Sequence, residues 1–389
     1  MADNGEPLTA LSFGACPLPK SRYEHILLGH GSGGQLTAEL IQRLFVPGFG
    51  NDVLGALEDQ ATLVLPFPPL TPNPSPPKRG RGETRTPLSP GGGEGLGVRG
   101  PRLAFTTDAF VVRPLFFPGG DIGSLAFHGT VNDLAVGGAR PLFLSAAFIL
   151  EEGLALTDLQ RIVASMRQAC AEAGVSLVTG DTKVVDRGKG DGVYITTSGI
   201  GLVPEGCNLS IHNARPGDRI LVSGTIGDHG IAILSVREGL EFETVLESDT
   251  APLTVLAQAI LTACPRTRCM RDATRGGLSS VLNELAVASR VGVKLKETAI
   301  PIRPEVRGAC EMLGLDPLYV ANEGKLIAVV PAEDAERVLA AMQAQPLGKN
   351  AALIGEVVAD IHGMVILRSL VGGERVVTML AGEQLPRIC

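Results

Sequence analysis

Apolar residues recur along the chain with two alternating periodicities, which predicts a protein of mixed helices and strands. Leu36–Phe45 has apolar residues three and four positions apart, as on one face of a helix. Thr157–Ala173 repeats that pattern, with Thr157 as the expected N-cap and Gly174 as the terminator. Leu142–Leu150 and Val193–Leu202 are short apolar runs typical of buried strands. Strands and helices therefore alternate through the first half.

The second half of the chain also alternates predicted strands and helices, after a break in the hydrophobic pattern. Pro204–Gly206 marks the break, and Arg219–Ser223 is the next expected strand. A glycine-rich turn follows it, with a helix expected from Ile231 and another over Leu278–Ser289. We therefore expect an α/β (α+β) fold with this division: a flexible leader at 1–24, domains at 25–205 and 206–380, and a flexible tail at 381–389.

Residues 66–101 differ sharply in composition from the rest of the chain. They contain ten prolines and eight glycines, so they cannot bury enough apolar surface to offset the entropy lost on ordering. We predict a disordered insertion between the strand-like runs Leu57–Leu65 and Arg102–Thr107, which would otherwise be neighbours in a hairpin. The insertion is either a binding loop for an acidic partner or a tolerated segment without a role.

Composition narrows the class of protein. The net charge of −7, the absence of tryptophan and an aromatic content of 4% argue against a nucleic-acid partner. No apolar run has the length of a membrane span, and the first residues lack the pattern of a signal peptide. Seven scattered cysteines fit a reducing cytoplasm better than a disulfide framework. We expect a cytoplasmic protein that does not bind membranes.

Several aspartates lie at the ends of predicted elements among small or apolar neighbours. Any one of them fits an ordinary cap or turn residue. Together they predict convergence on a cleft, where hard carboxylate oxygens suit Mg²⁺ bound with substrate phosphates. The residues in this setting are Asp59, Asp108, Asp133, Asp181, Asp228 and Asp272.

A glycine-rich stretch supplies the second half of a nucleotide site. It consists of Gly31, Ser32, Gly33 and Gly34 and precedes a predicted helix, whose first N–H groups would face phosphates. The stretch lacks the Gly-Lys-Ser/Thr ending of a Walker A loop, and a simple flexible turn is the alternative. Combined with the aspartates, it predicts a site for Mg²⁺ and ATP.

The chain ends on a cysteine, in the sequence Leu-Pro-Arg-Ile-Cys. A thiol at this position is expected to be accessible and mobile. The nine tail residues extend over about 30 Å, enough to enter a cleft in this or a neighbouring subunit. The α-carboxylate of Cys389 disfavours its thiolate, and we expect Arg387 to offset that charge. Arg387→Glu is therefore predicted to slow covalent loading of the thiol.

The ordered motifs GHGSGG, FTTDAF, GTVNDLAVGGA, TGDTKVV, SGTIGDHG, RDATRGGL, ANEG and PRIC resemble one family. This is the HypE family of hydrogenase maturation factors, within the PurM-like (aminoimidazole ribonucleotide synthetase-like) ATP-dependent superfamily. The resemblance runs from about residue 25 to 389, interrupted by the insertion.

The resemblance implies a two-domain protein that dimerises through its N-terminal domains. It also implies that the terminal thiol accepts a carbamoyl group from the carbamoyltransferase HypF. ATP then drives dehydration of the thiocarbamate to a thiocyanate. The cyano group passes to iron on a HypC–HypD complex, on the way to the nickel–iron hydrogenase site.

The resemblance also implies roles for individual residues. Cys389 is the expected carrier. From their positions near glycines and strand ends, Glu323 and Lys183 are our candidates for handling protons and activating oxygen; a turn carboxylate and a surface lysine are their alternatives. His229 would contact phosphates or cap its loop. The expected metal ligands are Asp59, Asp108, Asp133 and Asp272. The expected ATP contacts are Gly31, Ser32, Gly33, Gly34, Asn132, Asp181 and Asp228.

Two other functions remain open at this point. One keeps the fold but changes the reaction to another PurM-like phosphoryl transfer, of the selenophosphate synthetase or thiamine monophosphate kinase type. Neither needs a terminal thiol, so turnover without Cys389 would favour it. The other is a non-catalytic thiol carrier or scaffold, which absence of Mg–ATP binding would favour.

Overall fold

A computed structural model gives the structure of the chain. It describes residues 34–46, 55–64, 102–239, 246–382, 385 and 387–389. The predicted leader, the predicted insertion at 66–101 and the candidate residues Gly31, Ser32 and Gly33 lie outside these ranges. Among the helices that it describes, none has both the length and the apolar character to cross a membrane.

The N-terminal half is built on a five-stranded sheet. Its order is β1 (Ala61–Val64), β2 (Arg102–Phe110), β7 (Val193–Val203), β5 (Arg140–Glu151) and β6 (Ser176–Val185). β1 and β2 pair antiparallel, although the predicted insertion separates them in sequence. This confirms that the two strand-like runs are neighbours.

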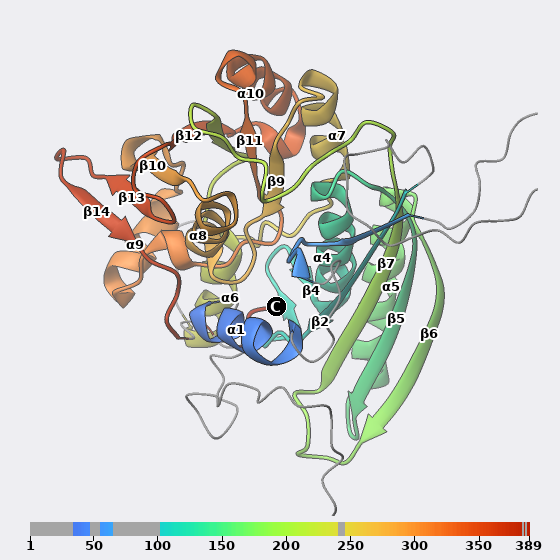
Figure 1. Ribbon diagram of the computed structural model, residues 1–389. Coiled ribbons are helices and arrows are strands. Elements are labelled where there is room, and N and C mark those ends of the chain that lie inside the picture. Colours follow the sequence, from blue (N-terminus) through green and yellow to red (C-terminus); the bar gives the residue numbers. More distant parts are fainter. Residues whose placement is uncertain (1–33, 47–54, 65–101, 240–245, 383–384, 386) are drawn as a thin grey trace, which may run out of the picture.

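Two helices, α4 (Ile122–Val136) and α5 (Leu156–Ala173), pack on one face of this sheet (Figure 1). Asp121 caps α4, accepting a hydrogen bond from Gly123 N at 2.7 Å. The prediction that Thr157 caps α5 is wrong, because the N-cap is Ala155, two residues earlier, and Thr157 lies inside the first turn. Gly174 does end α5, at φ +65°.

The C-terminal half is built on a seven-stranded sheet covered on both faces. Buried residues of α8 (Gly277–Ser289) pack on one face. Those of α7 (Thr254–Ala263) and α10 (Ala335–Gln343) pack on the other. The strands, in spatial order, are β14 (Glu374–Val377), β13 (Val365–Arg368), β10 (Gly292–Lys296), β12 (Ala352–Val358), β8 (Arg219–Val222), β11 (Leu326–Val330) and β9 (Cys269–Asp272).

Shorter elements complete the fold. The helix expected from Ile231 is α6 and begins three residues earlier, because Gly227 adopts the left-handed conformation at φ +82° and starts it. The other elements are α6 (Asp228–Glu238), α9 (Pro304–Leu313), α1 (Gln35–Leu40) with the π-helical turn Ile41–Phe45, β3 (Phe116–Phe117), β4 (Gly120–Asp121), and 3₁₀ turns at Glu297–Ala299, Pro317–Tyr319, Ala332–Asp334 and Pro346–Gly348.

Helix α4 joins the two halves. It contacts β2 and β7 of the first sheet and also β9 and α7 of the second half. Thirteen of its fifteen residues are buried, as a helix packed on several sides requires. The C-terminus lies between the two halves, beside α4 and α6 (Figure 1). The end of the chain therefore lies at the junction of the domains.

Candidate active site

Three predicted metal ligands meet at this junction. Asp133 lies on α4, Asp272 is the last residue of β9, and Asp59 precedes β1. One carboxylate oxygen from each lies within 4.8 Å of the others. The packing of α4 against β9 brings together residues that are far apart in sequence.

Burial makes the charged forms of these carboxyls unfavourable. It raises the pKa of Asp272 to about 6 and the pKa values of Asp59 and Asp133 well above their usual range. Thr106 Oγ1 donates to Asp133 at 2.7 Å, and Arg271 lies 2.6 Å from Asp59. Three crowded carboxylate oxygens match the preference of a hard divalent cation such as Mg²⁺, whose charge would favour their deprotonated forms.

Asp108 lies beside this group and takes part in the adjoining cavity. Thr130 Oγ1 donates to its Oδ2 at 2.7 Å, and burial raises the pKa of Asp108. The cavity has a volume of about 40 Å³, and Asp133, Asp272 and Cys389 also line it. Candidate carboxylates and the terminal thiol therefore share one cavity.

The terminal thiol is inside the protein, not on an exposed tail. Cys389 is only 8% exposed, so the expected accessible thiol is wrong for this arrangement. Its side chain and the Glu323 carboxyl line the same cavity and interact there. Burial, followed by the charge of Glu323, raises the pKa of the thiol well above its usual range. Burial and the charge of Asp249 do the same for the pKa of Glu323.

The cation beside the thiol is Arg275, which the sequence analysis did not single out. Arg275 lines the cavity, and its charge lowers the pKa of Cys389 against the larger effect of burial. The expected cation, Arg387, instead pairs with Asp191 at 2.9 Å. The only sequence signal for Arg275 was its place in the loop just after Asp272, ahead of two glycines.

Asn132 and Asp228 are committed to structural bonds. Asn132 Nδ2 donates to the carbonyls of Ala251 (3.0 Å) and Glu323 (3.2 Å). Its Oδ1 accepts from Leu253 N at 2.7 Å, so Asn132 fixes the backbone at Glu323. Asp228, which was expected to contact ATP, is the first residue of α6 and accepts a hydrogen bond from the Thr225 hydroxyl. It does not line the cavity of Cys389.

Asp181 and Lys183 lie elsewhere in the single chain. Both are exposed on the edge strand β6, and Asp181 accepts a hydrogen bond from the next backbone N–H. Three strand spacings separate β6 from the strand of Asp108, about 14 Å at roughly 4.8 Å each. Neither residue lines the cavity of Cys389.

Gly34 has a packing role at the start of the predicted phosphate loop. A Cβ at this position would lie 2.3 Å from the carbonyl oxygen of Leu380. The next residue, Gln35, donates its N–H to the same oxygen at 2.6 Å. Close approach of two backbones therefore explains this glycine.

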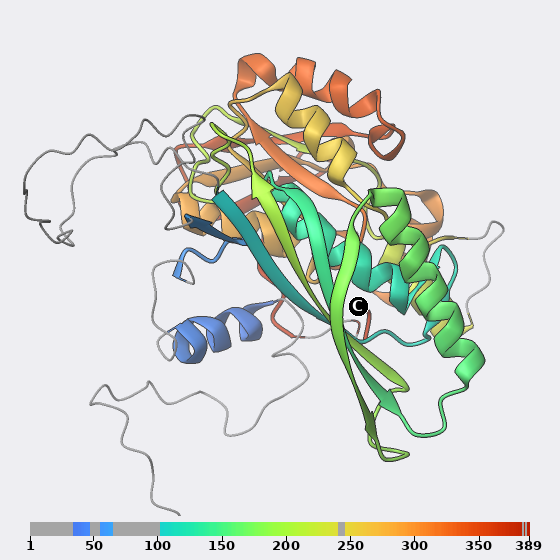
Figure 2. The same cartoon turned by 90° about the vertical axis from the view of Figure 1, so that its right-hand side faces the viewer.

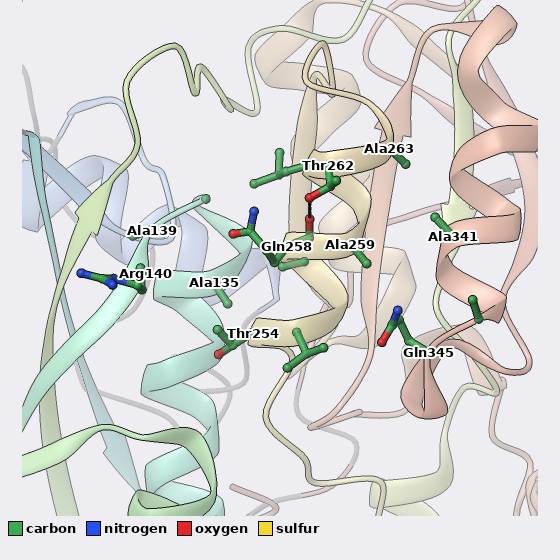
Figure 3. Close-up of a pocket in the computed structure, with 15 residues that line it drawn as sticks. Ala135, Ala139, Arg140, Thr254, Gln258, Ala259, Thr262, Ala263, Ala341 and Gln345 are labelled. Carbon is green, nitrogen blue, oxygen red and sulfur yellow. Dashed lines mark hydrogen bonds between the residues drawn. The ribbon is translucent and has the colours of Figure 1, made fainter.

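A larger pocket of about 670 Å³ lies between α4, α7 and α10 (Figure 3). Alanine is the most frequent residue in its lining, and Arg140 is the single ionisable residue there. A Mg²⁺–nucleotide site needs acidic ligands, which this lining lacks. The larger pocket therefore does not fit the predicted Mg²⁺–nucleotide site.

Comparison with known proteins agrees with this architecture. Residues 96–203 match the family model "AIR synthase related protein, N-terminal domain", and residues 215–368 match the corresponding C-terminal domain model. The chain is 56% identical over 360 residues to the carbamoyl dehydratase HypE of Azotobacter vinelandii, covering 92% of this chain and 96% of that one. The chain belongs to the HypE family of carbamoyl dehydratases. The family suggested by the motifs is thereby confirmed.

Solved structures of the family have the same fold. A HypE structure in complex with ATP is 45% identical, with a TM-score of 0.72 and coverage of 94% of this chain and 100% of that one. A HypE–HypF complex is 44% identical, with a TM-score of 0.75 and coverage of 88% and 99%. These matches confirm the two-domain PurM-like fold. They favour the HypE activity over the phosphotransferase and carrier alternatives.

Proposed function

We propose that this protein dehydrates a carbamoyl group carried on Cys389 to a thiocyanate, at the expense of ATP. The observation that carries the proposal is the terminal thiol, docked in a cavity with Glu323 and beside three clustered carboxyls. The HypE family of carbamoyl dehydratases supports the reaction, and the relative crystallised with ATP supports the nucleotide. The product would supply the cyanide ligand for nickel–iron hydrogenase maturation in the cytoplasm.

Asp59, Asp133 and Asp272 would hold Mg²⁺, with Asp108 beside them. The ion would neutralise phosphate charge while the γ-phosphoryl group of ATP moves to the carbamoyl oxygen. That oxygen then leaves as phosphate when its bond to carbon breaks. Loss of both N–H protons completes the carbon–nitrogen triple bond.

Glu323 is suited to take one of these protons. It contacts the sulfur that would carry the carbamoyl group, and its raised pKa makes it a better proton acceptor than an ordinary carboxylate. The cavity of about 40 Å³ beside the sulfur is on the scale of the three heavy atoms of that group. Asn132 and Asp249 bind the backbone of Glu323 and hold it in place.

A HypF-type carbamoyltransferase would load the thiol, as the crystallised complex of relatives suggests. A HypC–HypD complex would accept the cyano group, as the family resemblance implies. Both partners need access to a thiol that is buried here. We therefore propose that the tail leaves the cavity for loading and for delivery.

A second copy of the chain would cover the outer face of the N-terminal sheet. Phe105, Ile200 and Phe143 are paired neighbours there and are 43%, 39% and 48% exposed. No described helix covers this face, and α4 and α5 lie on the other one (Figure 2). A homodimer through this sheet would also bring its edge strand, with Lys183 and Asp181, next to the partner. In such a dimer, Lys183 of one copy would act on the carbamoyl oxygen held by the other copy.

Mass spectrometry of the C-terminal peptide tests the reaction. The full chain is incubated with a HypF-type enzyme, its carbamoyl donor and Mg–ATP. We expect Cys389 to gain one carbamoyl group and then lose one water only when ATP is present, while Cys389→Ala gains nothing. An adduct that keeps its water in the presence of Mg–ATP would refute dehydration. Failure of the chain to bind Mg–ATP would favour the carrier alternative.

A further inference from the structure

The docked tail is held by its backbone as well as its side chains. The carbonyl of Ile388 accepts a hydrogen bond from His229 Nε2 at 2.8 Å. The carbonyl of Arg387 accepts from Arg113 N at 3.1 Å and from Arg237 Nη2 at 2.9 Å. Three donors on two consecutive carbonyls specify one path for the chain leading to Cys389.

The side chains of Arg387 and Ile388 make further contacts that hold the tail in place. The Ile388 side chain is 5% exposed and packs in the cluster that contains Phe110 and Ile233. Arg387 Nε donates to Asp191 at 2.9 Å, although Arg387 itself adopts the left-handed conformation at φ +53°. That conformation is unfavourable for a residue with a side chain, so the surrounding contacts must stabilise it.

The His229 ring is held so that its Nε2 donates to the Ile388 carbonyl. The ring is fully buried, and burial lowers its pKa, so the imidazole is neutral. Its Nδ1 lies 2.7 Å from Ser248 Oγ. Since Nε2 must carry the hydrogen that binds the Ile388 carbonyl, Nδ1 accepts from the serine hydroxyl. Ser248 is itself anchored, because its N–H donates to the Pro118 carbonyl at 2.8 Å.

We propose that His229, Arg237 and Asp191 form a latch that positions the tail for the ATP-dependent step and limits access to the thiol during loading. The proposal rests on the function above. Most of these contacts are made to the two residues before Cys389, and none to its sulfur. The latch therefore holds free and carbamoylated tails alike. Weakening it moves the balance toward the released tail.

Alkylation of Cys389 by iodoacetamide measures release directly, in the full chain without nucleotide. Arg237→Gln removes a charged donor to the Arg387 carbonyl, so we expect the alkylation rate to rise roughly threefold to tenfold. Arg237→Lys should restore part of the protection. Arg307→Gln, at an exposed arginine on α9, is the matched control and should leave the rate unchanged.

Buried cysteines in the same chain separate release of the tail from general unfolding. Cys264 and Cys269 are 0% and 1% exposed and lie in other parts of the core. Their alkylation should stay slow in Arg237→Gln. An equal rise at all three cysteines, or no rise at Cys389, would overturn the latch. This measurement needs no carbamoyl donor or ATP, so it stands even if the proposed reaction fails.

Arg387→Glu gives a second test because its expected sign is now reversed. The sequence predicted slower loading through the charge beside the thiol. The structure pairs Arg387 with Asp191, so the variant brings two carboxylates together and should speed both alkylation and loading. With a preloaded tail, a single turnover of dehydration should be slower. Slower loading in this variant would contradict the latch and restore the sequence-based explanation.

Discussion

The two sides of the active site are built in different ways. The carboxylate side consists of Asp133 and Asp272, on α4 and β9, with Asp59 packed against them. Its geometry depends on contacts between buried elements. The thiol side is a chain end held by two carbonyls, one ion pair and one apolar side chain. In the proposed function, the carboxylate side would therefore act as a preformed binding site and the thiol side as its covalent substrate carrier.

Glu323 is where the two sides meet. Its side chain contacts the sulfur of Cys389, and its backbone belongs to the fixed side. Asp249 accepts from its N–H at 3.1 Å, and Asn132 donates to its carbonyl. In the proposed function, Glu323 would be a fixed proton acceptor facing the carried substrate, as general base catalysis requires.

Loss of the Glu323 carboxylate should have the largest effect on the dehydration step. In Glu323→Gln we expect loading of Cys389 to continue and dehydration to fall by about 10²–10⁴, the usual contribution of a general base. Single-turnover mass spectrometry should show the carbamoyl adduct accumulating. Glu311→Gln, at an exposed glutamate of α9, is the control. Unchanged dehydration would assign the proton transfer to another group.

A change confined to the carboxylate side should separate it from the thiol side. We expect Asp272→Asn to weaken Mg²⁺ binding by at least about tenfold, as even indirect ligand supports do when lost. Docking and alkylation of Cys389 should be unchanged. Mg²⁺ titration by calorimetry in the presence of ATP measures the first effect. Equal affinity in the variant and the wild type would remove Asp272 from the proposed ligands.

The smallest effect is a dependence on pH. The pKa of Asp272 is about 6, those of Asp59 and Asp133 are also raised, and metal ligands must be deprotonated, so Mg²⁺ affinity should rise at least about tenfold per pH unit as pH approaches 6 from below. In the absence of metal, folding stability depends on pH in the opposite direction to Mg²⁺ affinity. The folded state binds more protons than the unfolded state, so stability falls as pH rises from the usual value to about 6. Asp272→Asn should lose this step in both measurements.

Local patterns predicted much of the fold. Gly174 was expected to end α5 and does so, because a left-handed glycine terminator depends only on the neighbouring residues. The pairing of β1 with β2 was also expected from two strand-like runs. Errors fell at element ends, where Thr157 proved not to be a cap and α6 begins at Asp228. Whether a helix begins one turn earlier or later depends on tertiary contacts that the local sequence does not contain.

The sequence alone determined the family, the mixed fold and a set of acids and a thiol able to carry the chemistry. Residue type and spacing are sufficient for these conclusions. Only the tertiary structure decided that Asp59, Asp133 and Asp272 meet, and that Asn132 supports the backbone of Glu323. It also gave Arg387 the partner Asp191 and the thiol the cation Arg275. These choices depend on packing between elements far apart in the chain, which a local pattern does not encode.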